Sequence, residues 1–203
     1  YLNATRAYYK RKNISLDVEY VFKSKDALVE FETVNPNFLF DGDALLFNFN
    51  YSKKGIGINA NLRRMENFGF YSERGLNRNS FNEGLLNYIP SLTKQYDYSL
   101  TNIYVYQAQP FLVFEPEGNK AGEIGGQFDL FYTFQKGSFF GGKNGTSLAL
   151  NFSTWYGLKG RFDAAQRKYE AEFIGFGEKF YTDGSLEIRK NISSKWTTIF
   201  TYL

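Results

Sequence analysis

The chain has 203 residues, a formal net charge of +3 and an aromatic content of 20%. This length suits a single domain, and the small, scattered charge gives no basis for nucleic-acid binding. Cysteine and histidine are both absent, which excludes disulfides, thiol chemistry and the histidine pairings that activate most nucleophiles. No apolar run approaches the roughly 18 residues that a transmembrane helix needs.

Residues 43–64 alternate with a period of two on either side of a four-residue turn, SKKG. This pattern predicts an antiparallel hairpin. One face carries large apolar side chains: Leu45, Phe47, Phe49, Tyr51, Ile56, Ile58 and Leu62. The opposite face carries small amides and glycine, rather than the Lys, Glu and Thr of a solvated sheet, and this favours a lined interior. We therefore interpret the segment as a hairpin of a membrane-spanning β-barrel, whose strands keep the average hydropathy low.

The same alternation predicts the other strands. They are expected at residues 1–9, 14–23, 123–134, 146–156, 169–189 (interrupted near 176–184) and 196–203. Two turn-forming sequences, NPN and DGD, predict a loop over residues 24–42, with a strand extension at 29–33. A second polar loop is expected at 157–168.

The connections alternate between short or moderate and mostly longer ones. Residues 10–13, 52–55, 135–145 and 191–195 belong to the first set, and residues 24–42, 65–120 and 157–168 to the second. Bacterial outer-membrane barrels have short periplasmic turns and long external loops. The first strand then runs inward and the last outward, so both ends of the chain would lie outside the cell. Barrels of this class normally begin and end in the periplasm, and we therefore expect this chain to be an interior part of a larger barrel.

Residues 65–120 interrupt the alternation and are too long for a structureless loop. We expect a folded extracellular lobe, inserted between strands of the single β-barrel domain 1–203, with a short helix near 82–88 and a hairpin near 98–106. Tyrosine combines a large contact area with a polar tip and suits recognition surfaces. Either the lobe binds a partner or its tyrosines pack it against the barrel rim. The candidate partner-binding residues are Tyr88, Tyr96, Tyr98, Tyr104 and Tyr106.

Polar residues on the amide face are candidates to line the lumen. They are Asn48, Asn50, Asn59, Asn61, Arg63, Asp17, Glu19 and Asp129. Their charges either select a solute or ligand, or pair with opposite charges across a narrow lumen and hold its shape. A soluble barrel or sandwich would have the same period with its apolar face inward. The amide faces, the loop asymmetry and the tyrosines near strand ends favour the membrane.

Metal, cofactor and catalytic motifs are weak. Asp41-Gly42-Asp43 lacks the twelve-residue spacing of a known calcium loop and is expected to be a plain turn. No pair of carboxylates can be placed at a defined separation for acid–base catalysis. We expect no metal, no cofactor and no enzymatic activity, and we rank a surface hydrolase last.

Three stretches carry a resemblance to a known family. They are ALLFNFNYSKKGIGINANLRRMENFGFYSER, SLTKQYDYSLTNIYVYQAQP and GEIGGQFDLFYTFQKGSFFGGKNGTSLALNFS. The chain resembles uncharacterised outer-membrane β-barrel proteins of Bacteroidota over most of residues 14–203. The resemblance implies a Gram-negative outer-membrane location and a protein longer than 203 residues. It implies no site residue.

Two functions follow as hypotheses. The first is a non-enzymatic barrel, embedded in the lipid bilayer, whose lobe docks other outer-membrane proteins or lipoproteins of an assembly. The second is a channel for uptake of a small solute along the amide face.

Overall fold

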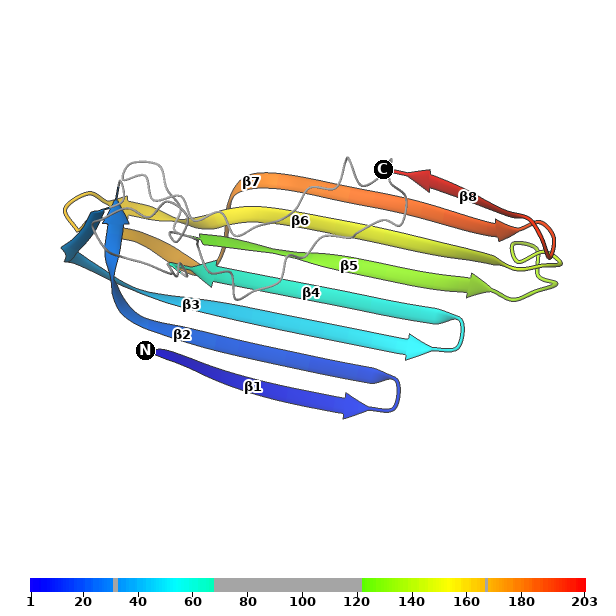
Figure 1. Ribbon diagram of the computed structural model, residues 1–203, viewed down its shortest axis with the longest axis horizontal. Coiled ribbons are helices and arrows are strands. Elements are labelled where there is room, and N and C mark those ends of the chain that lie inside the picture. The colour runs from blue at the N-terminus through cyan, green and yellow to red at the C-terminus, as the bar shows by residue number, and fades with distance from the viewer. Residues whose placement is uncertain (31–32, 68–121, 167) are drawn as a thin grey trace.

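The computed structural model describes residues 1–30, 33–67, 122–166 and 168–203. These residues fold into an antiparallel sheet of eight strands, in which each strand pairs with its neighbours in sequence (Figure 1). The strands are β1 (Leu2–Arg11), β2 (Ile14–Glu30), β3 (Thr33–Lys53), β4 (Ile56–Glu66), β5 (Gly122–Phe134), β6 (Thr146–Asp163), β7 (Lys168–Asn191) and β8 (Thr197–Tyr202). The all-β antiparallel prediction is confirmed. Within the described residues there is no helix of the length and apolarity needed to cross a membrane.

The hairpin predicted at residues 43–64 is confirmed as β3 and β4. Asn48 pairs with Asn61, and Tyr51 pairs with Ile58. The strands extend further than expected, because Lys53 still pairs with Ile56 and leaves a two-residue turn. Gly55 closes this turn with φ of 85°, a backbone conformation that glycine adopts without steric cost.

The loop predicted at residues 24–42 is wrong, because β2 and β3 continue through most of it. Pro36 has no N–H to donate to a ladder, and the pairing jumps from Ala27–Leu39 to Leu28–Asn35, which leaves residues 36–38 in a bulge. Gly42 makes no turn either. It pairs with Lys23, and a Cβ at Gly42 would lie 2.4 Å from the carbonyl oxygen of Asn67. The glycine therefore permits a close approach of backbones.

The loop predicted at residues 157–168 is wrong for the same reason. β6 continues to Asp163, and Gly160 pairs with Ala171 in β7. A Cβ at Gly160 would lie 2.2 Å from the carbonyl oxygen of Glu170. Three register shifts along this pair place extra residues in β7, and between Ala171 and Phe176 four residues of β7 lie opposite the single residue Lys159 of β6.

The sheet has two ends of different character. The connections β1–β2, β3–β4, β5–β6 and β7–β8 all lie at one end, on the right in Figure 1, which we call the hairpin end. The extended strands β2, β3, β6 and β7 project at the other, distal end. Residues 68–121 lie outside the described residues. The predicted lobe, with its helix near 82–88 and hairpin near 98–106, therefore lies outside them apart from its first three residues, of which two belong to β4.

The sheet is open among the described residues. β1 pairs with β2 alone and β8 with β7 alone. Closure into a barrel is not seen, and the arrangement is an extended antiparallel sheet.

The two faces of the sheet differ in chemistry, and we call them the polar face and the apolar face. Cross-strand rows on the apolar face align large side chains. The row through the middle contains Leu16, Phe49, Ala60, Phe128 and Phe152. Exposure on this face is high, with Leu62 at 56% and Phe152 at 49%. Asn151 and Ser153, on either side of Phe152 in the chain, are 5% and 2% exposed on the polar face. The sheet thus buries polar groups and exposes apolar ones.

Candidate functional site: the polar face of the sheet

Two neighbouring rows bring most of the predicted lumen residues together on the polar face. Each row crosses the sheet from β2 to β7 through directly paired residues. One row is Asp17, Asn48, Asn61, Gln127, Ser153 and Asp183. The other row is Ser15, Asn50, Asn59, Asp129, Asn151 and Ser185. We call these twelve residues the amide rows. Their shared face is the one that the alternation predicts.

Asp129 is the most buried of the predicted lumen carboxylates, at 7% exposure. Asn151 donates from Nδ2 to Asp129 Oδ1 at 2.7 Å, and Gln127 donates from Nε2 to Asp129 Oδ2 at 2.9 Å. Two amides therefore hold this carboxylate. Among the described residues, Oδ1 of Asn151 and Oγ of Ser185 have no hydrogen-bond partner although both atoms are buried. Such groups are usually satisfied by ordered water.

Arg63 lies next to the amide rows, towards the distal end, in a row with Gly125 and Trp155. Its guanidinium carbon lies 4.4 Å from the centroid of the Trp155 ring, and its Nη2 lies 2.6 Å from Oε1 of Glu123. The side chains of Arg63 and Glu123 are 0% and 4% exposed. We call Arg63, Glu123, Gly125 and Trp155 the arginine cluster.

Gly125 makes the arginine cluster possible. A Cβ at this position would lie 2.4 Å from the carbonyl oxygen of Thr154 and 2.5 Å from Cε3 of Trp155. Without a side chain on β5, the Trp155 ring lies across that strand and meets Arg63 from β4. A desolvated cation over a ring is stabilised by up to about 2 kcal/mol, and the carboxylate neutralises a charge that would otherwise be costly to bury.

The charged residues predicted on this face pair in part. Glu19 lies 2.9 Å from Arg6 of β1, in a pair whose arginine side chain is 56% exposed. Arg63 pairs with Glu123, whereas Asp129 is held by amides. Glu19 and Arg63 therefore pair with charges on neighbouring strands, whereas pairing across a lumen stays a prediction.

Three members of the arginine cluster are not among the sequence-predicted residues. Trp155 and Glu123 follow the same alternate positions as Asn151 and Asp129, so strict continuation of the period would have found them. Gly125 could not be predicted as a member of the cluster, because a glycine in a strand does not indicate which aromatic ring will pack over it. The predicted partner-binding tyrosines, Tyr88 to Tyr106, lie outside the described residues.

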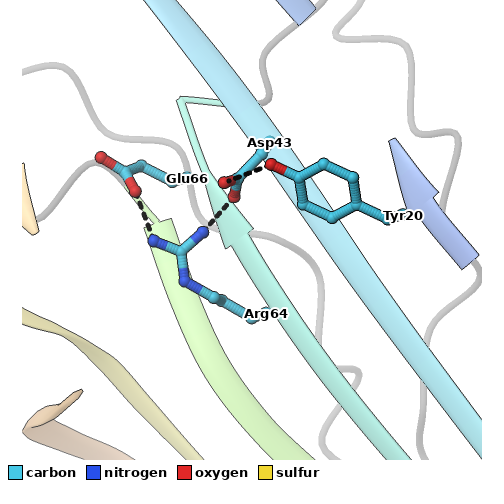
Figure 2. A network of polar contacts seen from close by, with 4 residues as sticks. All are labelled: Tyr20, Asp43, Arg64 and Glu66. Atoms are coloured by element: carbon cyan, nitrogen blue, oxygen red, sulfur yellow. Dashed lines mark hydrogen bonds and ion pairs between the residues drawn. The ribbon is translucent and has the colours of Figure 1, made fainter. Parts of the chain in front are cut away.

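A second polar network lies on the apolar face, at its distal end. Arg64 forms ion pairs with Asp43 and Glu66, and the Tyr20 hydroxyl donates to Oδ2 of Asp43 at 3.2 Å (Figure 2). Arg64 also lies 4.7 Å from the centroid of the Phe173 ring. We call Tyr20, Asp43, Arg64 and Glu66 the rim network. It buries an arginine, 4% exposed in its side chain, on a face of otherwise apolar character.

A family model, Family of unknown function (DUF6029), matches residues 1–203. The chain belongs to the DUF6029 family. Comparison with curated proteins and with solved structures finds no match.

For this DUF6029 chain, what the candidate site can do chemically is inferred from the arrangement of its side chains. The described residues contain no group of three or more acidic, cysteine or histidine side chains that could hold a metal ion. The polar face instead presents amides, hydroxyls and carboxylates that exchange hydrogen bonds with each other, and an arginine cluster that packs one end of it.

Proposed function

We propose that this chain forms part of the wall of a transmembrane β-barrel in the Gram-negative outer membrane. The observation that carries the proposal is the polarity of β6. Phe152 is 49% exposed between Asn151 at 5% and Ser153 at 2%. Water would favour the reverse arrangement, whereas a lipid-facing outer surface and a polar interior favour this one.

The dimensions of the apolar face support the same proposal. On β5, the apolar face runs from Ile124 to Phe134. These eleven residues make ten steps along the strand, which span about 33 Å at roughly 3.3 Å per step. A tilt of about 40° reduces this to about 25 Å, the height of the apolar band of outer-membrane barrels.

Aromatic side chains at the hairpin end support a membrane boundary there. The rings of Tyr132 and Phe134 lie 4.8 Å apart, and Phe140 lies 5.5 Å from Phe134. Phe139 and Trp196 are 94% and 74% exposed in and beside the connections. Aromatic girdles occupy this position in membrane barrels.

Spectroscopic labelling of two adjacent positions tests the orientation. The chain has no cysteine, so Leu62→Cys and Asn61→Cys each provide one labelling site within it, on opposite faces of β4. In phospholipid vesicles, a fluorophore on the Leu62→Cys variant is quenched by brominated acyl chains, and one on the Asn61→Cys variant is not. Equal quenching at both positions would contradict the orientation.

We further propose that the barrel is a non-enzymatic scaffold whose lobe, residues 65–120, docks other outer-membrane proteins or lipoproteins. Support comes from the tyrosine-rich sequence of the lobe, and from its place in the chain between β4 and β5, because the end of β4 and the start of β5 lie towards the distal end of the sheet (Figure 1). A mild-detergent pull-down compares the intact protein with a variant lacking the lobe, after vesicle insertion of both has been checked. Loss of partners with the lobe is expected, and an unchanged set of partners would refute docking.

A channel for a small solute is the second candidate, and the amide rows favour it. Asn48, Asn61 and Gln127 offer neighbouring donors and acceptors along one face. Planar-bilayer recording tests it with Asn61→Trp, a bulky change on the polar face, against Ala7→Trp on the apolar face of β1. Reproducible current steps that only the first variant reduces would support a channel over a pure scaffold.

A further inference from the structure

A half-open hollow lies on the apolar face near the distal end. It has a volume of about 620 Å³, within the range of about 300–1,000 Å³ that is usual for small-molecule sites. Its floor comes from β3 to β6 and its far wall from the first part of β7. The side chains that the argument uses are Ala60, Leu62, Phe128, Phe152, Phe173 and Phe176.

Two features of the sequence create this hollow, which we call the apolar pocket. Gly126 lies between Leu62 and Thr154 in its row and supplies no side chain to fill the floor. The extra residues of β7 bring Phe173 and Ile174 to the pocket wall. Lys159 and Glu172, 3.0 Å apart, link this part of β7 back to β6.

The rim network borders the pocket, because Arg64 lines the pocket and lies against the Phe173 ring. The Arg64 guanidinium forms ion pairs with Asp43 and Glu66. Apart from arginine at this border, glycine, Gln127 and Thr154, the lining is hydrocarbon and aromatic. A hydrogen-bonding ligand would therefore lose its water without gaining partners, whereas a hydrocarbon chain would lose nothing.

We propose that the apolar pocket binds one acyl chain of a phospholipid from the surrounding bilayer. The proposal rests on the membrane orientation proposed above. The pocket is continuous with the apolar face, so a chain reaches it from the bilayer without crossing a polar surface. Ile174 and Phe176, 72% and 57% exposed at the wall, offer side-chain surface for van der Waals contact with the chain.

Photolabelling tests the proposal with the full-length protein in phosphatidylethanolamine vesicles that contain a phospholipid with a diazirine on its acyl chain. We expect labels to concentrate on Leu62, Phe128 and Phe173, above the level at Leu150 and Phe200 on the same face outside the pocket. Even labelling along the apolar face would overturn the pocket and leave the orientation intact. Labelling that avoids the apolar face would overturn both.

A pocket-filling variant gives an independent measurement. Ala60→Trp places a ring in the pocket, and Ala7→Trp makes the same change on the apolar face of β1, outside it. After delipidation, mass spectrometry of the intact protein should find one retained phospholipid on the wild type and on Ala7→Trp. Retention by Ala60→Trp should fall about tenfold, as expected when roughly two methylene groups lose their contacts. A retained free fatty acid in place of a phospholipid, or equal retention by both variants, would refute the proposal.

Discussion

Replacing Gly125 with alanine should destabilise the protein strongly through one added methyl group. The new Cβ would lie 2.4 Å from the carbonyl oxygen of Thr154 and 2.5 Å from the Trp155 ring. Relief of this overlap requires the ring to leave its position beside Arg63, 4.4 Å away. Overpacking costs about 1–3 kcal/mol, and loss of a desolvated cation–ring contact costs up to about 2 kcal/mol. The alanine also lowers the entropy of the unfolded chain, which offsets about 0.4–1 kcal/mol of this destabilisation. We therefore expect the free energy of unfolding to fall by about 2–4 kcal/mol.

Urea unfolding of the purified protein in detergent, followed by circular dichroism, measures this change. Gly57→Ala is a matched control on the polar face of β4, because a Cβ there would meet its nearest neighbour, Phe131, at 3.8 Å. The control should be neutral or slightly stabilising. Equal losses for Gly125→Ala and Gly57→Ala would refute the explanation. The double variant Gly125→Ala, Trp155→Leu should lose less than the sum of the single changes, since the ring is then absent.

Three further changes test the ion pairs and the amide-held carboxylate by the same unfolding measurement. Glu123→Gln should lower the free energy of unfolding by at least about 2 kcal/mol, because it leaves the buried Arg63 charge less compensated. Glu172→Gln, at the exposed pair with Lys159, should change it by less than about 1 kcal/mol. Equal effects of the two changes would contradict the role of burial. Asp129→Leu should lower the free energy of unfolding more than Asp129→Asn does. The leucine leaves the buried amide of Asn151 without its acceptor, which costs about 1–3 kcal/mol per unsatisfied group. The reverse order would show that Asn151 finds another partner. Tyr20→Phe should lose only about 0.5–1.5 kcal/mol, the value of one hydrogen bond to Asp43, and a larger loss would mean that the hydroxyl holds the whole rim network in place.

The strands can be predicted from the sequence where alternation is strict. The prediction is wrong where proline and glycine occur within strands, because both residues also favour turns. Asn48 and Asn61 were assigned correctly to one face because a period of two leaves no choice. The loop predicted around Pro36 and Gly42 is wrong because these residue types occur in bulges and at close backbone approaches as well as in loops. That distinction depends on the partner strand, here Ala27 and Leu28 for Pro36 and the end of β4 for Gly42.

The candidate site was predicted as a face but not as a set of contacts. The sequence placed Arg63 and Asp129 on the polar side, yet their partners come from strands far apart in the chain, Glu123 for one and Asn151 for the other. The burial of Arg64 against Phe173 likewise depends on the register shifts of β7. A local sequence pattern does not show which distant strands pair, or where their register shifts.

The length of the distal strands has a mechanical consequence. β6 has 18 residues and β7 has 24, whereas a tilted strand crosses a bilayer with about 9–11. In the proposed orientation, the remainder would continue the sheet beyond the membrane as hydrogen-bonded backbone. The exterior of the protein would then be a stiff extension of its wall, without a hinge at the membrane surface, and a pull applied there would be transmitted directly to the strands within the bilayer.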